Sequence, residues 1–320
     1  MAQRSSNIGG QAVMEGIMMR HKDVYSIAVR KPDKEIEVKV EDYKSVIPIK
    51  GINKIPILRG VFNFIDSLVV GTKCLMYSAR FYEDEEDTKK EEKVLTAEEQ
   101  EKADAKEEKQ YKILMGVTVT FSIVISVALF MLLPYFVANL LRHVTTANWI
   151  ITIAEAVIRI ALFLTYMVLI SKMEDIQRVF MYHGAEHKCI NCIEHGMELK
   201  VENVMKSSRQ HSRCGTSFLF IVMIVSIIFF FFIHTSSPVL RVVLRVLLVP
   251  VIAGVSYEFI RLAGRSDNVC VRWLSKPGLA LQKLTTQEPT EDMCEVAIAA
   301  VEAVFDWREY LRENGFEVTS

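Results

Sequence analysis

A group of metal-binding residue types stands at His183-Gly-Ala-Glu186-His187. Residues four apart share one face of a helix, so the imidazoles of His183 and His187 can reach one ion, with Glu186 beside them. The order His-x-x-Glu-His is that of the inverted zinc-hydrolase helix, in which two histidines bind zinc and the glutamate activates water. The spacing therefore predicts a divalent metal site, most simply zinc, with Glu186 as the catalytic base.

Further candidate ligands lie close by, because four of the seven histidines and three of the six cysteines fall within residues 183–214. Zinc binds imidazole and thiolate in a tetrahedral shell, so two ligands are not enough. We expect His211 and Cys214 to supply the rest, because they belong to a later segment that can fold back across the ion. Glu194 lies about 10 Å beyond His187 on a continuous helix and is not expected to share the ion. The alternative is a polar loop with ordinary surface histidines.

Other residues of these types are weaker candidates. Cys189 and Cys192 form a Cys-x-x-Cys pair, but the sequence contains no second such pair. Packing or incidental thiols are therefore favoured over a zinc ribbon or a redox pair. Glu258 is a candidate extra ligand or partner of a ligand, with an ion pair to Arg261 as the alternative.

The elements that position these residues include membrane-length segments. The chain of 320 residues is 51% hydrophobic yet 24% charged, so apolar and charged residues are segregated. Four segments reach the length of about 17 to 25 residues that a spanning helix needs. The predicted fold class is a mainly α polytopic membrane protein with about four transmembrane helices and both termini on one side. The predicted spans are 113–141, 149–170, 217–233 and 238–263.

Two charged residues fall inside the second predicted span. Glu155 and Arg159 are four apart, which is the spacing of a mutual ion pair. The alternative is that they line a polar cavity or bind a headgroup. A transporter is disfavoured, because four spans offer a narrow pore path at best.

Almost all Lys and Arg residues lie on the side of the membrane that would hold 1–112, 171–216 and 264–320. By the positive-inside rule this side is the cytoplasm, with the spans in the inner membrane. The predicted partners are the lipid bilayer and a substrate that is a lipid headgroup or a membrane-anchored peptide. No basic stripe with interleaved aromatic residues occurs, so nucleic-acid binding is not expected. The first residues lead into no apolar core, so no cleavable signal peptide is expected.

Outside the spans, a β-hairpin is predicted around a turn at 31–34, after a glycine-rich stretch whose backbone can turn tightly or approach a ligand. An amphipathic helix is predicted at 55–80, lying on the bilayer or packing on the spans, with a re-entrant segment as the alternative. Another amphipathic helix is predicted at 290–314. The predicted parts are an N-terminal module at 1–82, a charged linker at 83–112, a transmembrane pair at 113–170, a metal-binding loop at 171–216, a second pair at 217–263 and a C-terminal segment at 264–320.

Groups of residues spread over nearly the whole chain match one family pattern. They are Gly9-Gly-Gln-Ala-Val-Met-Glu-Gly16 with Met18-Met-Arg20, Leu58-Arg-Gly60, Tyr182-His-Gly-Ala-Glu-His-Lys188, Arg213-Cys-Gly-Thr-Ser-Phe218, Ser256-Tyr-Glu258 with Arg261, and Leu284-Thr-Thr286 with Glu288-Pro289. Through them the chain resembles the bacterial membrane-protein family called domain of unknown function 1385, the YqhQ-like proteins. The resemblance implies a predicted metal-dependent membrane enzyme. Cys189 and Cys192 stand where other residue types are common, and Ser212 where proline is common, which weakens the two cysteines as ligands.

The predicted function is a metal-dependent hydrolase at the cytoplasmic membrane surface, with the N-terminal module covering the site. The alternative is a noncatalytic scaffold or assembly factor, in which a structural zinc is closed by four protein ligands. The predicted site consists of His183 and His187 with one or both of His211 and Cys214 as metal ligands, Glu186 as general base, and Lys188 or Arg213 to steady an anionic substrate.

Overall fold

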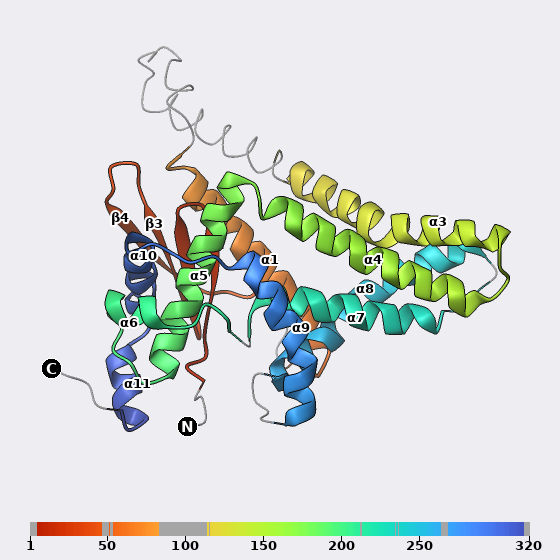
Figure 1. Ribbon diagram of the computed structural model, residues 1–320. Coiled ribbons are helices and arrows are strands. Elements are labelled where there is room, and N and C mark those ends of the chain that lie inside the picture. The colour runs from red at the N-terminus through yellow and green to blue at the C-terminus, as the bar shows by residue number, and fades with distance from the viewer. Residues whose placement is uncertain are drawn as a thin grey trace, which may run out of the picture. The chain divides into compact units, whose positions relative to one another are not determined.

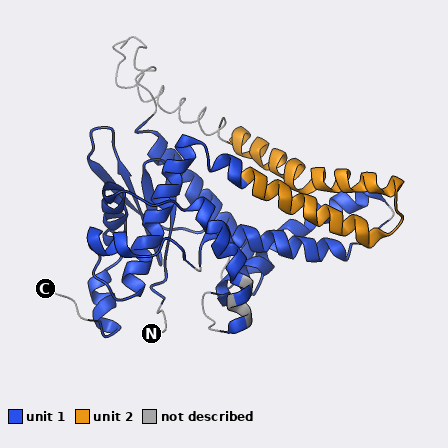
Figure 2. Ribbon diagram, viewed as in Figure 1, with its two compact units in different colours: residues 1–82, 167–320 blue, residues 83–166 orange. Residues whose placement is uncertain are grey.

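The computed structural model describes residues 5–46, 51, 54–82, 114, 116–211, 213–233, 235, 237–263 and 268–316. The described chain is mainly helical, as predicted, with one small antiparallel sheet (Figure 1). It divides into two compact units, of which the first comprises residues 1–82 and 167–320 and the second residues 83–166 (Figure 2). The predicted charged linker, 83–112, lies outside the described residues.

The sheet belongs to the first unit, and its strands follow one another in the order β1-β2-β3-β4, all antiparallel. The predicted hairpin is present as β3 and β4. The glycine-rich stretch before it forms two further strands, joined by tight turns in which Glu15 and Lys22 have φ values of 48° and 53°. Positive φ in a short connection matches the twist of the strands that it joins. The strands are β1 (Ile8–Val13), β2 (Gly16–His21), β3 (Val24–Arg30) and β4 (Ile36–Asp42).

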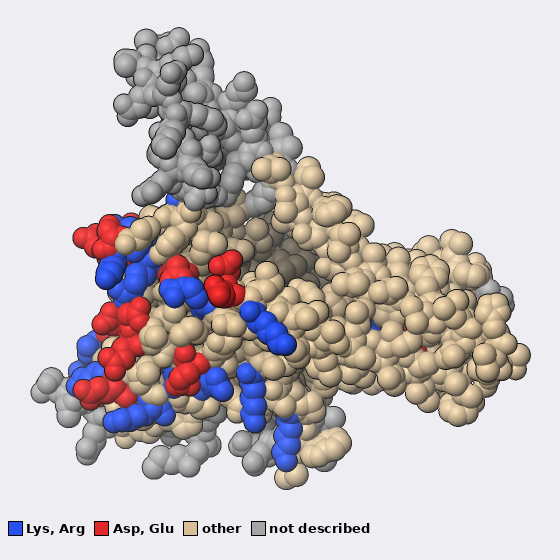
Figure 3. All heavy atoms as spheres, turned by 45° about the horizontal axis from the view of Figure 1, so that its top comes forward, with Lys and Arg blue, Asp and Glu red and all other residues tan. Residues whose placement is uncertain are grey.

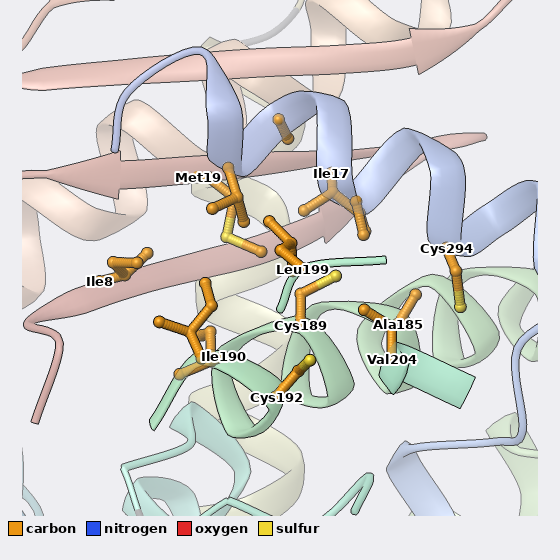
Figure 4. Close-up of a cluster of buried hydrophobic side chains, with 14 of the residues drawn as sticks. Ile8, Ile17, Met19, Ala185, Cys189, Ile190, Cys192, Leu199, Val204 and Cys294 are labelled. Atoms are coloured by element: carbon orange, nitrogen blue, oxygen red, sulfur yellow. The ribbon is translucent and has the colours of Figure 1, made fainter. Parts of the chain in front are cut away.

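Helices cover both faces of this sheet. Ile17 and Met19 of β2 belong to the core that the sheet shares with α5 and α10, which Figure 4 shows. Met18, between them in sequence, packs on the opposite side with Val70 and Cys74 of α1. This alternation follows from the two-residue period of a strand. The three helices are α1 (Leu58–Ala79), α5 (Glu174–Glu194) and α10 (Glu291–Glu302).

Apolar helices occur in both units. In the first unit α7 packs against α8 and α9. In the second unit, residues 116–127 continue through the π-helical turn η3 into α3 and the 3-10 turn η4, and α4 follows. The bounds are η3 (Ala128–Leu132), α3 (Leu133–Asn139), η4 (Leu140–His143), α4 (Asn148–Ile170), α7 (Gly215–Phe231), α8 (Pro238–Ala263) and α9 (Val269–Thr285).

Three of these helical segments are long and apolar enough to cross a membrane, namely Gly116–His143, Asn148–Ile170 and Pro238–Ala263. The chain is therefore a polytopic membrane protein. The remaining predicted span, 217–233, corresponds to α7, an apolar helix of 17 residues. A helix of that length extends about 25 Å, near the lower limit for crossing. The four-span count and the placing of both termini on one side stay predictions.

Charged side chains of the first unit gather over its sheet. In Figure 3 the visible Lys, Arg, Asp and Glu residues lie mostly over the sheet and the helices that cover it.

Within α4, Arg159 Nη2 lies 2.6 Å from Glu155 Oε1, and both residues are buried. The mutual ion pair predicted from their spacing is therefore confirmed.

Helix α1 connects the sheet to α8, since it packs on both. Its Asp66 is buried and satisfied, because Tyr43 Oη and the backbone N–H of Val46 donate to its two oxygens at 2.7 and 2.9 Å. Leu68 and Val69 on the same helix remain 52% and 47% exposed. The predicted amphipathic helix is thus present, with an apolar surface that the described residues leave open.

The C-terminal segment differs from the single helix predicted at 290–314. It forms α10 and then α11 (Trp307–Glu313), separated by a short break. The break occurs because the Asp306 side chain accepts a hydrogen bond from the backbone N–H of Glu309 at 2.9 Å and caps a new helix.

The contact between β4 and α1 gives the fold a pH dependence. Lys73 Nζ and Tyr25 Oη of neighbouring elements donate to Glu41. Burial alone raises the pKa of Glu41, but hydrogen bonds from Lys39, Lys73 and Tyr25 lower it to about 2 from an ordinary 4.5. The carboxylate therefore stabilises the fold above pH 4.5, and this stability is lost as the pH falls through about 2.

Replacing Glu41 with Gln is expected to cost about 1 kcal/mol at pH 7, because Lys73 is largely exposed and solvent screens the pair. Below pH 4.5 the melting temperatures of the variant and the wild type should approach each other. Thermal unfolding of the detergent-solubilised protein, followed by circular dichroism between pH 7 and pH 2.5, measures the difference. Glu37→Gln on the same strand serves as the control, and a Glu41 effect that does not change with pH would contradict the assignment.

Candidate metal centre

Helix α5 carries the His-x-x-Glu-His segment in its buried half. It packs on β1, β2 and α10. After α6 (Val201–Lys206), the chain returns alongside α5 through residues 207–211. The predicted metal-binding loop at 171–216 is therefore largely helical, and its return segment provides the fold-back expected of the later ligands.

The two imidazoles on α5 are oriented by backbone carbonyls. Nδ1 of His183 lies 2.9 Å from the carbonyl oxygen of Thr285, and Nδ1 of His187 lies 2.7 Å from that of Arg209. A carbonyl can only accept, so each Nδ1 carries the proton and each Nε2 presents a lone pair. Burial lowers the pKa of His187, although its hydrogen bond with Cys214 opposes this effect. The neutral imidazole is the form that binds metals.

Cys214, which follows the return segment, approaches this pair. Its Sγ lies 3.3 Å from Nε2 of His183 and accepts a hydrogen bond from the Thr216 backbone N–H at 3.4 Å, as the N-cap of α7. The N-terminal end of a helix favours a negative charge, as a thiolate ligand carries. The ligand atoms of His183, His187 and Cys214 all lie within 4.8 Å of one another. Tetrahedral zinc holds such atoms about 3.5 Å apart, so small side-chain rotations suffice to reach that geometry.

A cavity of about 120 Å³ adjoins the three ligand atoms. One water occupies about 30 Å³ in the liquid, so this space admits an ion and accompanying water. The N-terminal module forms one wall of it, as predicted. The lining residues are Ile8, Gly9 and Gly10 of β1, His183, Glu186, His187 and Ile190 of α5, and His211, Arg213, Cys214 and Gly215.

Glu186 places a carboxylate in this cavity. The side chain is 5% exposed, and its Oε2 has no hydrogen-bond partner among the described residues. Burial raises the pKa of Glu186 above its ordinary value, and the hydrogen bond from the Gly10 backbone only partly opposes this effect. Gly10 is required here, because a Cβ at that position would stand 2.6 Å from the Met18 carbonyl oxygen and 3.1 Å from Glu186 Cδ. A buried acceptor without a partner fits a site built for a metal ion or a reacting water.

His211 lies beside the three-ligand group but engages another residue. Its ring centroid is 5.8 Å from that of His187, and its Nε2 lies 3.3 Å from Oε2 of Glu194. Arg213 and the backbone N–H and hydroxyl of Ser6 also donate to Glu194. Burial alone raises the pKa of Glu194, but His211, Arg213 and Ser6 together lower it to about 2. The described residues thus bring together three of the four predicted ligands, with His211 held next to them by a carboxylate.

The two predicted anion-steadying residues have different positions. Lys188 is buried, where its Nζ donates to the Met205 carbonyl oxygen and pairs with Glu288, and it does not line the cavity. Arg213 does line the cavity, although it is also bound to Glu194 and Ser5.

The weaker candidates lie elsewhere. Cys189 and Cys192 are fully buried in the core between α5, the sheet and α10 (Figure 4), which supports the packing interpretation. Burial raises the pKa of both thiols. Glu258 on α8 accepts a hydrogen bond from Arg59 Nε at 2.6 Å. Its ion-pair partner is therefore on α1, whereas the sequence indicated Arg261.

Sequence reasoning missed the segment that orients His183. Residues 285–289 cross α5 at Gly184, where the Gln287 backbone N–H donates to the Phe180 carbonyl oxygen at 2.9 Å. A Cβ at Gly184 would stand 2.0 Å from the Gln287 carbonyl oxygen. The glycine inside the His-x-x-Glu-His segment therefore lets this strap lie close enough for Thr285 to reach His183. The family motif at 284–289 marked this segment in the sequence. The sequence did not show that the segment packs on α5.

The fold and the cluster define a polytopic membrane protein with a His/His/Cys group in its sheet-containing unit. Residues 55–307 match the family model described as "Protein of unknown function (DUF1385)". The chain belongs to this family, as its motifs predicted. It is 37% identical over 295 residues to the "Uncharacterized protein YqhQ" of Bacillus subtilis strain 168, a match that covers 91% of this chain and 89% of that protein. No solved structure matches the chain.

Proposed function

We propose that this protein is a metal-dependent hydrolase, with zinc as the metal, that acts at the cytoplasmic surface of the membrane. The observation that carries the proposal is one cavity that combines three converging ligand atoms with a buried carboxylate oxygen lacking a partner among the described residues. Catalytic zinc sites use three protein ligands and keep one position open, whereas structural sites close all four positions.

The residues have separate roles in this proposal. His183 and His187 hold the ion through Nε2, since the Thr285 and Arg209 carbonyls fix their rings, and Cys214 holds it through Sγ. A bound zinc ion supplies Lewis acidity toward a carbonyl or phosphoryl oxygen and makes water acidic near neutral pH. Glu186 removes a proton from the attacking water and returns it to the leaving group, so that one water is consumed for each bond cleaved.

The second candidate is a noncatalytic scaffold with a structural zinc. It requires His211 as a fourth ligand, either through Nδ1 with the Glu194 contact kept, or through Nε2 with that contact given up. Among the described residues, the ligand atoms that lie within 4.8 Å of one another belong to His183, His187 and Cys214, and His211 is not one of them. This placement favours the three-ligand arrangement and hence the enzyme.

Metal content tests the centre itself. The full-length protein, purified in detergent and analysed by inductively coupled plasma mass spectrometry, is expected to hold one zinc per chain. Loss of a ligand weakens binding steeply, so His183→Ala, His187→Ala and Cys214→Ser should each lower this stoichiometry at least tenfold after dialysis.

His195→Ala is the matched control, because this histidine lies at the end of the same helix, outside the cavity. His211→Ala distinguishes the two candidates. Full zinc content in this variant supports the three-ligand enzyme, and complete loss supports the four-ligand scaffold. Stoichiometric metal that survives removal of both His183 and His187 would show the centre to be wrongly placed.

A further inference from the structure

A second and larger cavity adjoins the metal-site cavity. It has a volume of about 550 Å³ and lies between the sheet and α1. Four residues line both cavities, namely Ile8, Gly9 and Gly10 of β1 and Arg213. A ligand in the larger cavity is therefore separated from the metal site by little more than the backbone of β1 and the Arg213 side chain.

The larger cavity has a cationic lining. Arg20 and Lys22 contribute positive charge, Arg213 adds a guanidinium that is already paired with Glu194, and none of the described residues that line the cavity is acidic. The nearby carboxylate of Asp66 is 3% exposed, is hydrogen-bonded by Tyr43 and Val46, and does not line the cavity. The other polar lining groups are neutral and belong to Asn7, Gln11, Tyr43 and Ser67. This composition favours an anionic ligand.

Arg20 is held in position for such a ligand. Its guanidinium carbon lies 3.2 Å from the centre of the Tyr43 ring, and its Nε donates to the Lys22 carbonyl oxygen at 3.2 Å. A guanidinium fixed in this way loses little freedom on binding, and its planar fork matches the oxygens of a phosphate. Lys22, in the turn between β2 and β3, adds a more flexible charge at the rim.

The α1 side of the cavity is close to apolar surface. Ser67 and Val70 of α1 line the cavity, and Leu68 and Val69 between them are about half exposed. The same helix packs on α8, one of the segments able to cross a membrane. A ligand whose charged group enters this cavity can therefore lay an apolar tail along α1.

We propose that this cavity binds the phosphate group of an anionic phospholipid, which is the substrate presented to the metal site. The inference rests on the proposed function and names its substrate class. Arg20 and Lys22 are the binding residues specific to this cavity, and Arg213 contacts the ligand where the two cavities meet. A soluble phosphate compound shares the headgroup chemistry but lacks the apolar tail that α1 would hold.

Binding can be measured without turnover. The full-length protein in neutral detergent, stripped of metal with a chelator, is titrated calorimetrically with three probes: dioctanoyl phosphatidate, inorganic phosphate and dioctanoylglycerol. Dioctanoyl phosphatidate is expected to bind saturably, one molecule per chain, and at least tenfold more tightly than either other probe. Arg20→Gln and Lys22→Gln should each weaken its binding about tenfold.

Lys34→Gln provides the matched control, because Lys34 also lies in a hairpin turn with positive φ, at the opposite end of β3. Equal affinity for inorganic phosphate overturns the lipid assignment, and equal affinity for dioctanoylglycerol overturns the headgroup assignment. Binding that Lys22→Gln leaves unchanged, or that Lys34→Gln weakens as much, places the ligand elsewhere. Since the metal is absent, a negative result here leaves the zinc measurements on His183 and His187 standing.

Discussion

Glu186→Gln is expected to lower the rate of hydrolysis about a thousandfold while leaving zinc content at the wild-type level. The amide has the shape of the carboxylate but cannot accept the proton of the attacking water. Because Oε2 of Glu186 is buried without a partner among the described residues, removing its charge should also leave the melting temperature of the metal-free protein equal or higher.

The rate is measured with zinc-loaded protein on dioctanoyl phosphatidate and on p-nitrophenyl esters of acetate and phosphate. An unchanged rate would remove Glu186 from the chemistry. A parallel loss of zinc would make it a ligand, and a large drop in melting temperature would make it structural. His195→Ala, on the same helix, should change none of the three readouts.

Gly184→Ala is expected to destabilise the protein by about 3 kcal/mol, because the added methyl group cannot be accommodated without displacing backbone. The new Cβ would stand 2.0 Å from the Gln287 carbonyl oxygen. Relief requires residues 285–289 to move off α5, and the Thr285 carbonyl that orients His183 moves with them. Zinc affinity should therefore fall together with stability.

Gly215→Ala supplies the comparison for this substitution. Gly215 begins α7 beside Cys214, and a Cβ there meets nothing within 4 Å. Alanine in a helix should be neutral or slightly stabilising at such a site. Thermal unfolding in detergent, with zinc content measured in parallel, separates the two glycines. Equal melting temperatures for both variants would show that the 285–289 strap is looser than the close approach at Gly184 requires.

The ligand pair and its helix were predictable because their evidence is local. His183 and His187 share a helix face through their spacing alone, and α5 bears this out. Cys214 was predicted because it belongs to a segment that follows the helix and precedes an apolar span. Such a segment can fold back onto the helix. These inferences need only the period of a helix and the order of elements along the chain.

The strands β1 and β2 were missed because their signal is not local. Gly9 and Gly10 weaken a strand prediction, since glycine has no side chain to pack and favours turns. The stretch becomes extended because it pairs with its neighbours, with Gly10 opposite Met19. Gly10 is needed instead for the approach of Glu186, a requirement set by another element of the fold.

For Glu194, the prediction from helix geometry was correct, but it did not reveal which residues this carboxylate binds. Its distance along α5 from His187 does exclude it from the three-ligand group. The return segment, however, runs back alongside α5 and places His211 and Arg213 at that same level. The register of a returning segment depends on contacts such as those between Gln282 and His211, which no periodicity reveals.

Cys214 belongs to two elements with different surroundings. Its sulfur completes the group formed by His183 and His187, while its backbone begins α7, an apolar helix of 17 residues. Two ligand atoms thus move with a helix packed on the sheet, and the third moves with a helix of the apolar region. If α7 crosses the bilayer, its short length makes its position sensitive to lipid thickness. The distance between sulfur and imidazoles then varies with the acyl chains around the protein, and the centre acquires a mechanical connection to the membrane that holds it.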